Sequence, residues 1–163
     1  MKTVHLLRHA KSDWNDEALQ DRERPLAPRG IQASRQLAQH LKTRHFAVDL
    51  VLCSTAQRTR ETLELLRPAL GKAEIKFEED LYGAGADELE LRLRRLPKKV
   101  AAVLIVGHNP GIEELASLLL PPAAGPGHFP TGALSSLRLP VSDWKSIVEG
   151  EAESIGFITP REL

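Results

Sequence analysis

The most constraining feature of this sequence is an unbroken apolar run, AAVLIVG at 101–107. A strand with one face in water alternates apolar and polar side chains, so a continuous run predicts a parallel strand buried on both faces. The run ends at His108, and Pro110 then indicates the start of a helix. Because open α/β sheets bind ligands at the carboxyl ends of their strands, His108 is a candidate site residue. A loop histidine that caps the next helix is the alternative.

Apolar runs and amphipathic stretches alternate along the rest of the chain. Strands are expected near 2–8, 48–53, 74–78, 101–107, 133–139 and 153–158, and helices near 30–43, 56–70, 87–96 and 111–120. This alternation favours an α/β fold with a mainly parallel sheet between two layers of helices, a three-layer α/β/α sandwich. The length of 163 residues and the absence of an internal repeat predict a single domain over 1–163.

The first predicted strand ends at Arg8 and His9. An arginine carries a planar fork of donors and stays charged, so it can hold phosphate oxygens without exchanging a proton. Histidine, with an ordinary pKa of about 6.5, offers a neutral ring nitrogen near neutral pH, and a neighbouring cation lowers that pKa further. The pair therefore indicates a phosphate site with its own nucleophile. A surface turn that happens to contain both residues is the alternative.

Two further segments contribute cations. LVLCSTAQRTRET at 50–62 is a second apolar strand followed by a helix, with Arg58 in the first turns of that helix. A cation at a helix start opposes the helix dipole, so a bound phosphate would explain Arg58, and a solvated arginine is the alternative. DRERPLAPRG at 21–30 is a proline-rich connection with three arginines. Loops of this kind are more often functional than idle, although for Arg22 and Arg24 individually a solvated surface position is the alternative.

Together these segments resemble the histidine phosphatase superfamily. The matching stretches are LLRHAKSDWN at 6–15, DRERPLAPRG at 21–30, STAQRTRET at 54–62, VGHNPG at 106–111 and PTG at 130–132. Their combination is similar to the small SixA-like phosphohistidine phosphatase branch. The resemblance implies the phosphoglycerate mutase-like fold of the superfamily and a hydrolase that acts through a phosphohistidine enzyme intermediate.

The resemblance also implies roles for individual residues. His9 corresponds to the phosphorylated nucleophile, and three side chains correspond to the phosphate-binding residues, namely Arg8, Arg58 and His108. Ser12 and Asn15 match positions at which family members contact the phosphoryl group of the substrate.

Two departures from the wider superfamily bear on the substrate. Lys11 stands where mutase-like members usually carry a glutamate. The general acid is also ambiguous, because Glu78, Glu79 and Asp80 are candidates for that role and equally fit a solvated acidic turn. Imidazole leaves phosphorus with less help from an acid than an alkoxide does. An absent acid therefore favours phosphohistidine over a sugar phosphate.

We therefore expect a metal-independent phosphatase that uses no cofactor, most simply a protein phosphohistidine phosphatase. Its partner would be a phosphorylated protein, such as a phosphohistidine-containing signalling protein, or a small phosphate compound. Two alternatives stay open. One is a small-molecule phosphomonoesterase on the same fold, and the other is a module that binds phosphate without turnover.

Composition narrows the remaining function classes. The 22 basic and 22 acidic side chains cancel, so no net charge directs the chain to nucleic acid or to a membrane. The chain has neither a secretory pattern at its start nor a membrane-length apolar stretch. Cys53 is the only cysteine, which excludes internal disulfides and fits a reducing compartment. We expect a cytoplasmic protein. A Cys-x5-Arg phosphatase loop from Cys53 to Arg58 would need glycines that the intervening residues lack.

Overall fold

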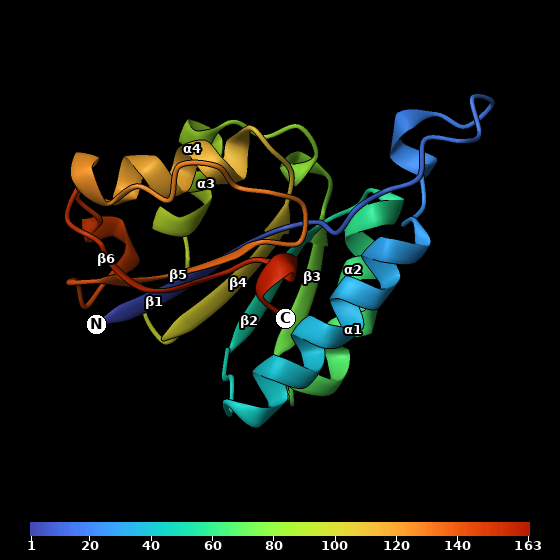
Figure 1. Ribbon diagram of the computed structural model, residues 1–163. Helices are drawn as coiled ribbons and strands as arrows, with labels where there is room; N and C mark the ends of the chain where they lie inside the picture. The colour runs from blue at the N-terminus through green and yellow to red at the C-terminus, as the bar shows by residue number, and fades with distance from the viewer.

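The computed structural model describes residues 1–163, and all six strands lie in one sheet in the order β3-β2-β4-β1-β5-β6 (Figure 1). The strands are β1 Lys2–Arg8, β2 Leu50–Ser54, β3 Glu74–Glu78, β4 Ala102–Gly107, β5 Leu134–Leu139 and β6 Glu153–Ile158. The first four pair in parallel, whereas β5 and β6 pair antiparallel. The predicted, mainly parallel sheet is confirmed.

Two layers of helices enclose this sheet. The helices are α1 Pro28–Thr43, α2 Gln57–Leu66, α3 Ala86–Arg94 and α4 Gly111–Leu119. In Figure 1, α1 and α2 lie on one face of the sheet, and α3 and α4 lie on the other. The second helix was predicted to reach residue 70, but α2 ends at Leu66 and a 3-10 turn follows. Pro68 has no N–H to donate to the preceding helical turn, which explains the early end.

Strand β4 shows why the apolar run at 101–107 was informative. Val103 and Ile105 pack into the cluster formed with α3 and α4, whereas Leu104 and Val106 pack into the cluster formed with α1 and α2. All four are buried. Full burial of an aliphatic side chain of this size stabilises the fold by roughly 1.5–3 kcal/mol. The strand is therefore buried on both faces, as its sequence predicts.

The register of the parallel strands aligns their carboxyl ends. In the pairing of β1 with β4, Arg8 lies opposite Gly107, and in the pairing of β2 with β4, Cys53 lies opposite Val106. The residues that follow these strands therefore emerge at one edge of the sheet.

The single cysteine, Cys53, is a core residue. Its side chain lies in the cluster beneath α1 and α2 and is fully buried. Its thiol contacts the Ser54 carbonyl oxygen at 3.3 Å. Burial is the main cause that raises the pKa of the Cys53 thiol to about 12. No helix in the structure has the length and apolar content needed to cross a membrane.

Candidate active site

Four of the predicted site residues gather at the carboxyl edge of the sheet. Arg8 ends β1 and His9 follows it, His108 follows β4, and Arg58 lies in the first turn of α2. The ring centroids of His9 and His108 are 5.3 Å apart. Both arginines also lower the pKa values of both histidines by charge repulsion. The structure therefore brings together two guanidinium groups and two imidazoles from three distant stretches of the chain.

The geometry at His9 defines which ring nitrogen is available for attack. Nδ1 lies 2.7 Å from the carbonyl oxygen of Ala10. Because a carbonyl oxygen only accepts hydrogen bonds, Nδ1 carries the proton and Nε2 keeps its lone pair. The Ala10 backbone is itself held by α2, since its N–H donates to Thr62 Oγ1 at 3.1 Å. The ring therefore presents Nε2 in a fixed orientation.

The pKa of His9 is lowered from 6.5 to about 3. Burial is the largest cause, and the hydrogen bond to Ala10 acts in the opposite direction. Charge repulsion from Arg58 and Arg8, and from His108 when it is protonated, lowers the pKa of His9 further. We expected the neighbouring arginine to lower this pKa, and it contributes less than burial does. The imidazole is neutral near neutral pH, which is its nucleophilic form.

His108 is also neutral. Its Nε2 lies 2.7 Å from Ser54 Oγ, and the Tyr82 ring packs edge-on at a centroid distance of 5.4 Å. Burial is the main cause that lowers its pKa to about 4, with Arg58 the next contributor. Because Ser54 directly precedes the loop into α2, this hydrogen bond links the ends of β2 and β4.

Arg8 has an unfilled donor. Its Nη1 donates to the Phe129 carbonyl oxygen at 3.0 Å, but its buried Nε has no hydrogen-bond partner. A buried polar group without a partner costs about 1–3 kcal/mol, and more when the group is charged. An oxygen of a bound phosphoryl group would satisfy this donor. The orphaned Nε is thus an observation in the structure itself that fits an anion site.

Arg58 is engaged by an internal carboxylate. Its Nη1 donates to the Asp21 carbonyl oxygen at 2.8 Å and its Nη2 to Asp21 Oδ2 at 3.0 Å. The same carboxylate accepts hydrogen bonds from Tyr82 Oη and from Arg24 Nη1. The hydrogen bond from Tyr82, followed by those from Arg58 and Arg24, holds the pKa of Asp21 well below its usual range. Asp21 is therefore an anion held against Arg58.

Sequence reasoning missed Asp21 and Tyr82 as neighbours of the site. In the loop at 21–30 the clustered arginines indicate a function, whereas the single aspartate gives no such signal. Asp21 lies 37 residues from Arg58 and 61 from Tyr82 along the chain, and no motif spacing relates them. Only the path of the loop brings them together.

Ser12 and Asn15 differ in where the structure places them. Ser12 is buried, and its Oγ accepts a hydrogen bond from Arg24 Nη2 at 2.6 Å. Asn15 is exposed, and its backbone N–H donates to Asp13 Oδ1 at 2.7 Å. No hydrogen bond joins either side chain to Arg8, His9, Arg58 or His108. Their contact with substrate stays a prediction.

The three candidate acids lie in and beside the 3-10 turn after β3. Glu78 accepts two hydrogen bonds of 2.8 Å from Arg92, which lower its pKa. Glu79 accepts one of 2.5 Å from Thr55, the main cause of its own lowered pKa. Asp80 is exposed and belongs to no ion pair. Glu78 and Glu79 are thus held as carboxylates, the form that cannot donate a proton.

Comparison with known proteins agrees with this arrangement. Residues 4–103 match the family model of the histidine phosphatase superfamily (branch 1). An uncharacterized protein of Mycobacterium tuberculosis is 35% identical over 163 residues, which cover 95% of this chain and 100% of the relative. The phosphohistidine phosphatase SixA of Escherichia coli is 32% identical over 140 residues, which cover 83% of this chain and 84% of the relative.

Solved structures give the same result for the fold. The structure of the protein histidine phosphatase SixA complexed with tungstate superimposes with a TM-score of 0.81 at 26% identity, covering 98% of this chain and 97% of that chain. The fold predicted from the sequence is confirmed, and a phosphatase activity is supported. From the family match and the identity to these relatives, the chain belongs to the histidine phosphatase superfamily.

Proposed function

We propose that the protein is a phosphohistidine phosphatase that transfers the phosphoryl group to His9 and then to water. The observation that carries this proposal is the cluster of His9, Arg8, Arg58 and His108, in which the Nε2 of His9 keeps its lone pair. We call this cluster the phosphate pocket. Family membership supports the phosphatase activity. The identity to the phosphohistidine phosphatase SixA of Escherichia coli supports the substrate class.

In the first step the lone pair of His9 Nε2 attacks phosphorus in line with the leaving group. A new P–N bond forms to His9, the P–N bond of the substrate breaks, and its electron pair returns to the substrate ring. The proton on the other ring nitrogen of the substrate makes the leaving group a neutral imidazole. Arg8, Arg58 and His108 hold the phosphoryl oxygens, and their donors stabilise the charge that spreads over these oxygens in the transition state. This is covalent catalysis, in which the nucleophile replaces one difficult displacement with two easier ones.

In the second step water attacks the phosphorus of phospho-His9. The P–O bond forms, the P–N bond to His9 breaks, and its electron pair returns to Nε2. The attacking water keeps one proton and loses the other to solvent, so the product leaves as hydrogen phosphate. The hydrogen bond from Nδ1 to the Ala10 carbonyl oxygen is present throughout and keeps the ring in one orientation.

The charge states of Asp21 and of two candidate acids support an imidazole leaving group. Asp21, Glu78 and Glu79 all have lowered pKa values, so each is an anion at neutral pH. An alkoxide leaving group needs a proton donor, whereas imidazole leaves as a weak neutral base. Phosphohistidine therefore fits the charge state of these acids better than a phosphate ester does.

A rapid-quench labelling experiment tests the proposal. The wild-type protein is mixed with a protein phosphorylated on histidine, quenched in alkali and digested, and mass spectrometry locates the label. We expect a transient phosphoryl group on His9 and release of inorganic phosphate. His9→Ala should abolish turnover, and His9→Asn should do the same while its amide still donates to the Ala10 carbonyl oxygen, which controls for local folding.

The outcomes separate the rival functions. Faster turnover of small phosphate esters than of phosphohistidine would identify a small-molecule phosphomonoesterase. Phosphate binding with no labelled His9 and no released phosphate would identify a binding module. The metal-independent part of the proposal is tested separately, because activity lost with a chelator and restored by a divalent ion would contradict it.

A further inference from the structure

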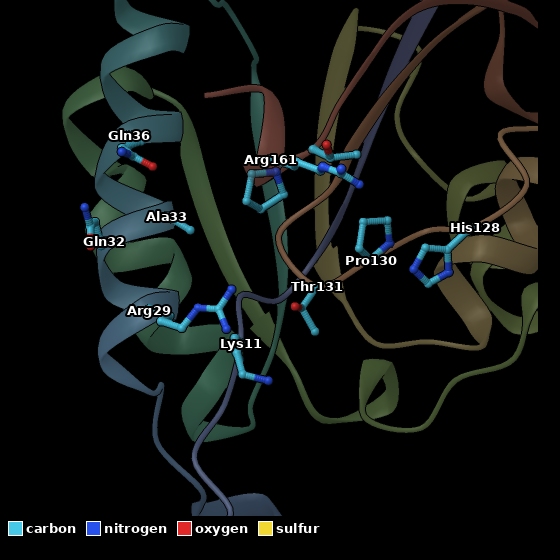
Figure 2. A pocket seen from close by; sticks show the side chains of 11 residues that line it. Lys11, Arg29, Gln32, Ala33, Gln36, His128, Pro130, Thr131 and Arg161 are labelled. Carbon is cyan, nitrogen blue, oxygen red and sulfur yellow. The ribbon is translucent and has the colours of Figure 1, made fainter.

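A groove of about 770 Å³ opens beside the proposed active site (Figure 2). Its walls come from Lys11, one side of α1, the loop at 128–131 and the C-terminal segment at 159–161. We call it the basic groove. Its charged and amide side chains and its histidine are Lys11, Arg29, Gln32, Gln36, His128 and Arg161.

The basic groove has an unbalanced charge. None of its eleven lining residues is an aspartate or a glutamate. Lys11, Arg29 and Arg161 are exposed and take part in no ion pair. Since the whole chain has equal numbers of basic and acidic side chains, three unpaired cations in one groove are a local feature and not a reflection of composition.

Arg29 gives a second sign of a missing anion. It lies in the first turn of α1, a helix of 16 residues whose first turn contains no acidic side chain. A cation at this end of a helix opposes the helix dipole, and an anion there is favoured. An acidic group in the basic groove would neutralise the unpaired positive charge. It would also interact favourably with the N-terminal end of the α1 dipole, which Arg29 opposes.

The basic groove and the proposed active site share a wall. The Phe129 carbonyl oxygen accepts a hydrogen bond from Arg8 at 3.0 Å, and its chain neighbours His128 and Pro130 line the basic groove. Gly132, which follows the same loop, donates its N–H to the His9 carbonyl oxygen at 2.9 Å. A ligand that reaches from the phosphate pocket across this loop enters the basic groove.

The position of the groove relative to His9 is fixed by backbone contacts. The Ala27 N–H donates to the Lys11 carbonyl oxygen at 2.9 Å. Gly30 lies so close to the same carbonyl that a Cβ atom there would be 2.2 Å from its oxygen. The first turn of α1 is therefore packed directly on the segment that follows His9, and Arg29 and Lys11 are held side by side (Figure 2).

The layout of the cations fits an extended acidic segment. In Figure 2, Lys11 and Arg29 lie at one end of the basic groove, and Arg161 lies well away from them. A single phosphate would need these cations to converge on it. Along α1, Gln32 and Gln36 also line the basic groove, and their amide groups can both donate to and accept from a peptide backbone.

We infer that the basic groove binds aspartate or glutamate side chains of the phosphorylated protein, next to the residue that enters the phosphate pocket. The turnover of a phosphohistidine next to these acidic side chains rests on the proposed function. The binding of an acidic peptide to the basic groove does not. The groove adds affinity and selects among phosphoproteins by charge, while the phosphate pocket performs the chemistry. Exposed complementary charges act mainly on specificity and on the rate of association.

Two peptides phosphorylated on one histidine test the inference. One has glutamates on both sides of the phosphohistidine, and the other has glutamines at the same positions. We expect the wild-type protein to have the higher kcat/KM for the acidic peptide, and that preference to decrease with added salt. In the Arg29→Gln/Arg161→Gln variant, kcat/KM for the acidic peptide should fall by roughly fivefold to tenfold, as expected for two exposed ion pairs. The values for the neutral peptide and for a small phosphate ester should not change.

A matched control removes the same charge elsewhere. Arg35 and Lys72 are exposed and belong to no ion pair. The Arg35→Gln/Lys72→Gln variant should keep the full preference for the acidic peptide. The charge reversal Arg29→Glu/Arg161→Glu should invert it, favouring a peptide flanked by lysines. An equal loss in both double-glutamine variants would overturn the inference, because only net charge would then matter.

Binding without phosphate separates this inference from the proposed function. Fluorescence anisotropy measures the affinity of the unphosphorylated acidic and neutral peptides for the wild-type protein and the Arg29→Gln/Arg161→Gln variant. Selective binding of the acidic peptide without turnover of any phosphohistidine would overturn the proposed function alone. Equal binding of both peptides would overturn the groove assignment alone. Binding of tripolyphosphate but not of acidic peptide would make the occupant a small polyanion and likewise overturn it.

Discussion

Arg8 donates to one backbone carbonyl and keeps a buried N–H without a partner, whereas both terminal nitrogens of Arg58 are occupied by Asp21. Arg8 belongs to a central strand, and its partner Phe129 lies in the loop before β5. Asp21 comes from an exposed 3-10 turn. Burial lowers the pKa of Arg8, and Glu113 lies near enough to raise it by charge attraction, but no hydrogen bond joins the two side chains. On the Arg8 side a donor is therefore still available to an anion, while on the Arg58 side an incoming phosphate has to share or displace a hydrogen-bonded carboxylate. We expect the two arginines to contribute unequally to catalysis.

The largest effect should follow from Arg8→Lys. A lysine keeps the charge but not the fork of donors, so it cannot replace the unpartnered Nε–H. Loss of one well-placed donor to a transition-state anion costs about 10²–10³ in rate, and we expect a decrease of that size in kcat/KM. Steady-state assays with phosphohistidine peptide measure it. Arg138→Lys is the matched control, because Arg138 lies in an exposed pair with Glu153 at 3.8 Å.

Arg58→Lys should have a smaller effect, roughly a 10- to 100-fold decrease in kcat/KM, because part of the Arg58 fork is already used by Asp21. The same assay and the same control apply. A decrease in kcat/KM as large as that of Arg8→Lys would show that phosphate displaces Asp21 completely. The expectation that the two arginines contribute unequally to catalysis would then be wrong.

The third test concerns the imidazole of His9. The pKa of His9 is about 3 in the folded protein against 6.5 in the unfolded chain. The unfolded state therefore binds more protons between these values, so the stability due to neutral His9 is complete above pH 6.5 and declines as the pH falls toward 3. Between pH 7 and pH 5 the free energy of unfolding should fall by about 1–2 kcal/mol more in the wild type than in His9→Asn.

Urea denaturation at several pH values measures this difference. The exposed His45, whose φ of 54° suits asparagine, supplies the control His45→Asn, which should follow the wild-type pH dependence. If His9→Asn also followed the wild-type curve, His9 would not be the buried neutral group that the mechanism uses.

The fourth test removes the internal anion. Asp21→Asn should tighten inhibition by phosphate or tungstate about fivefold, because two unit charges 4 Å apart in water repel by about 1 kcal/mol. Inhibition constants against a small ester measure the change. Glu17→Gln, at an exposed acid that belongs to no ion pair, should leave them unchanged. Weaker inhibition in Asp21→Asn would mean that Asp21 positions Arg58 more than it competes for it.

The smallest effect should come from Tyr82→Phe. The change removes one hydrogen bond to Asp21 but leaves its charge and its two arginine partners. Inhibition by phosphate should therefore change less than twofold, because the charge that competes for Arg58 is unchanged and the exposed carboxylate can accept a hydrogen bond from water in place of the phenol. A change as large as that of Asp21→Asn would mean that the hydrogen bond from Tyr82 is required for Asp21 to compete with phosphate for Arg58.

The fold was predictable where burial dictated the sequence. The run at 101–107 became β4 within one residue, because a strand covered on both faces tolerates only apolar side chains. The predicted end of α2 at residue 70 is wrong, because the amphipathic pattern continues past Pro68 although a proline has no N–H for the helical hydrogen bond. Arg58 could be singled out from its unfavourable place at a helix start.

Other parts of the site could not be predicted from the sequence. Asp21 contacts Arg58 only because the loop at 21–30 folds back toward α2. An acidic residue followed by arginines in a loop is typical of a solvated surface, so the sequence does not predict this contact. The basic groove is assembled from four separate parts of the chain. Three of these parts overlap the quoted motifs, but nothing in the motifs indicates that they line one groove. Such features depend on tertiary packing, which local patterns do not encode.

The burial of Cys53 has a consequence for chemical resistance. Phosphatases that attack with a cysteine depend on an accessible thiolate, and peroxide converts such a thiolate to sulfenic and higher acids. Here the sole sulfhydryl is enclosed in the core and stays protonated, while the proposed nucleophile is a nitrogen. The protein should therefore keep working during oxidative stress that silences cysteine-dependent phosphatases.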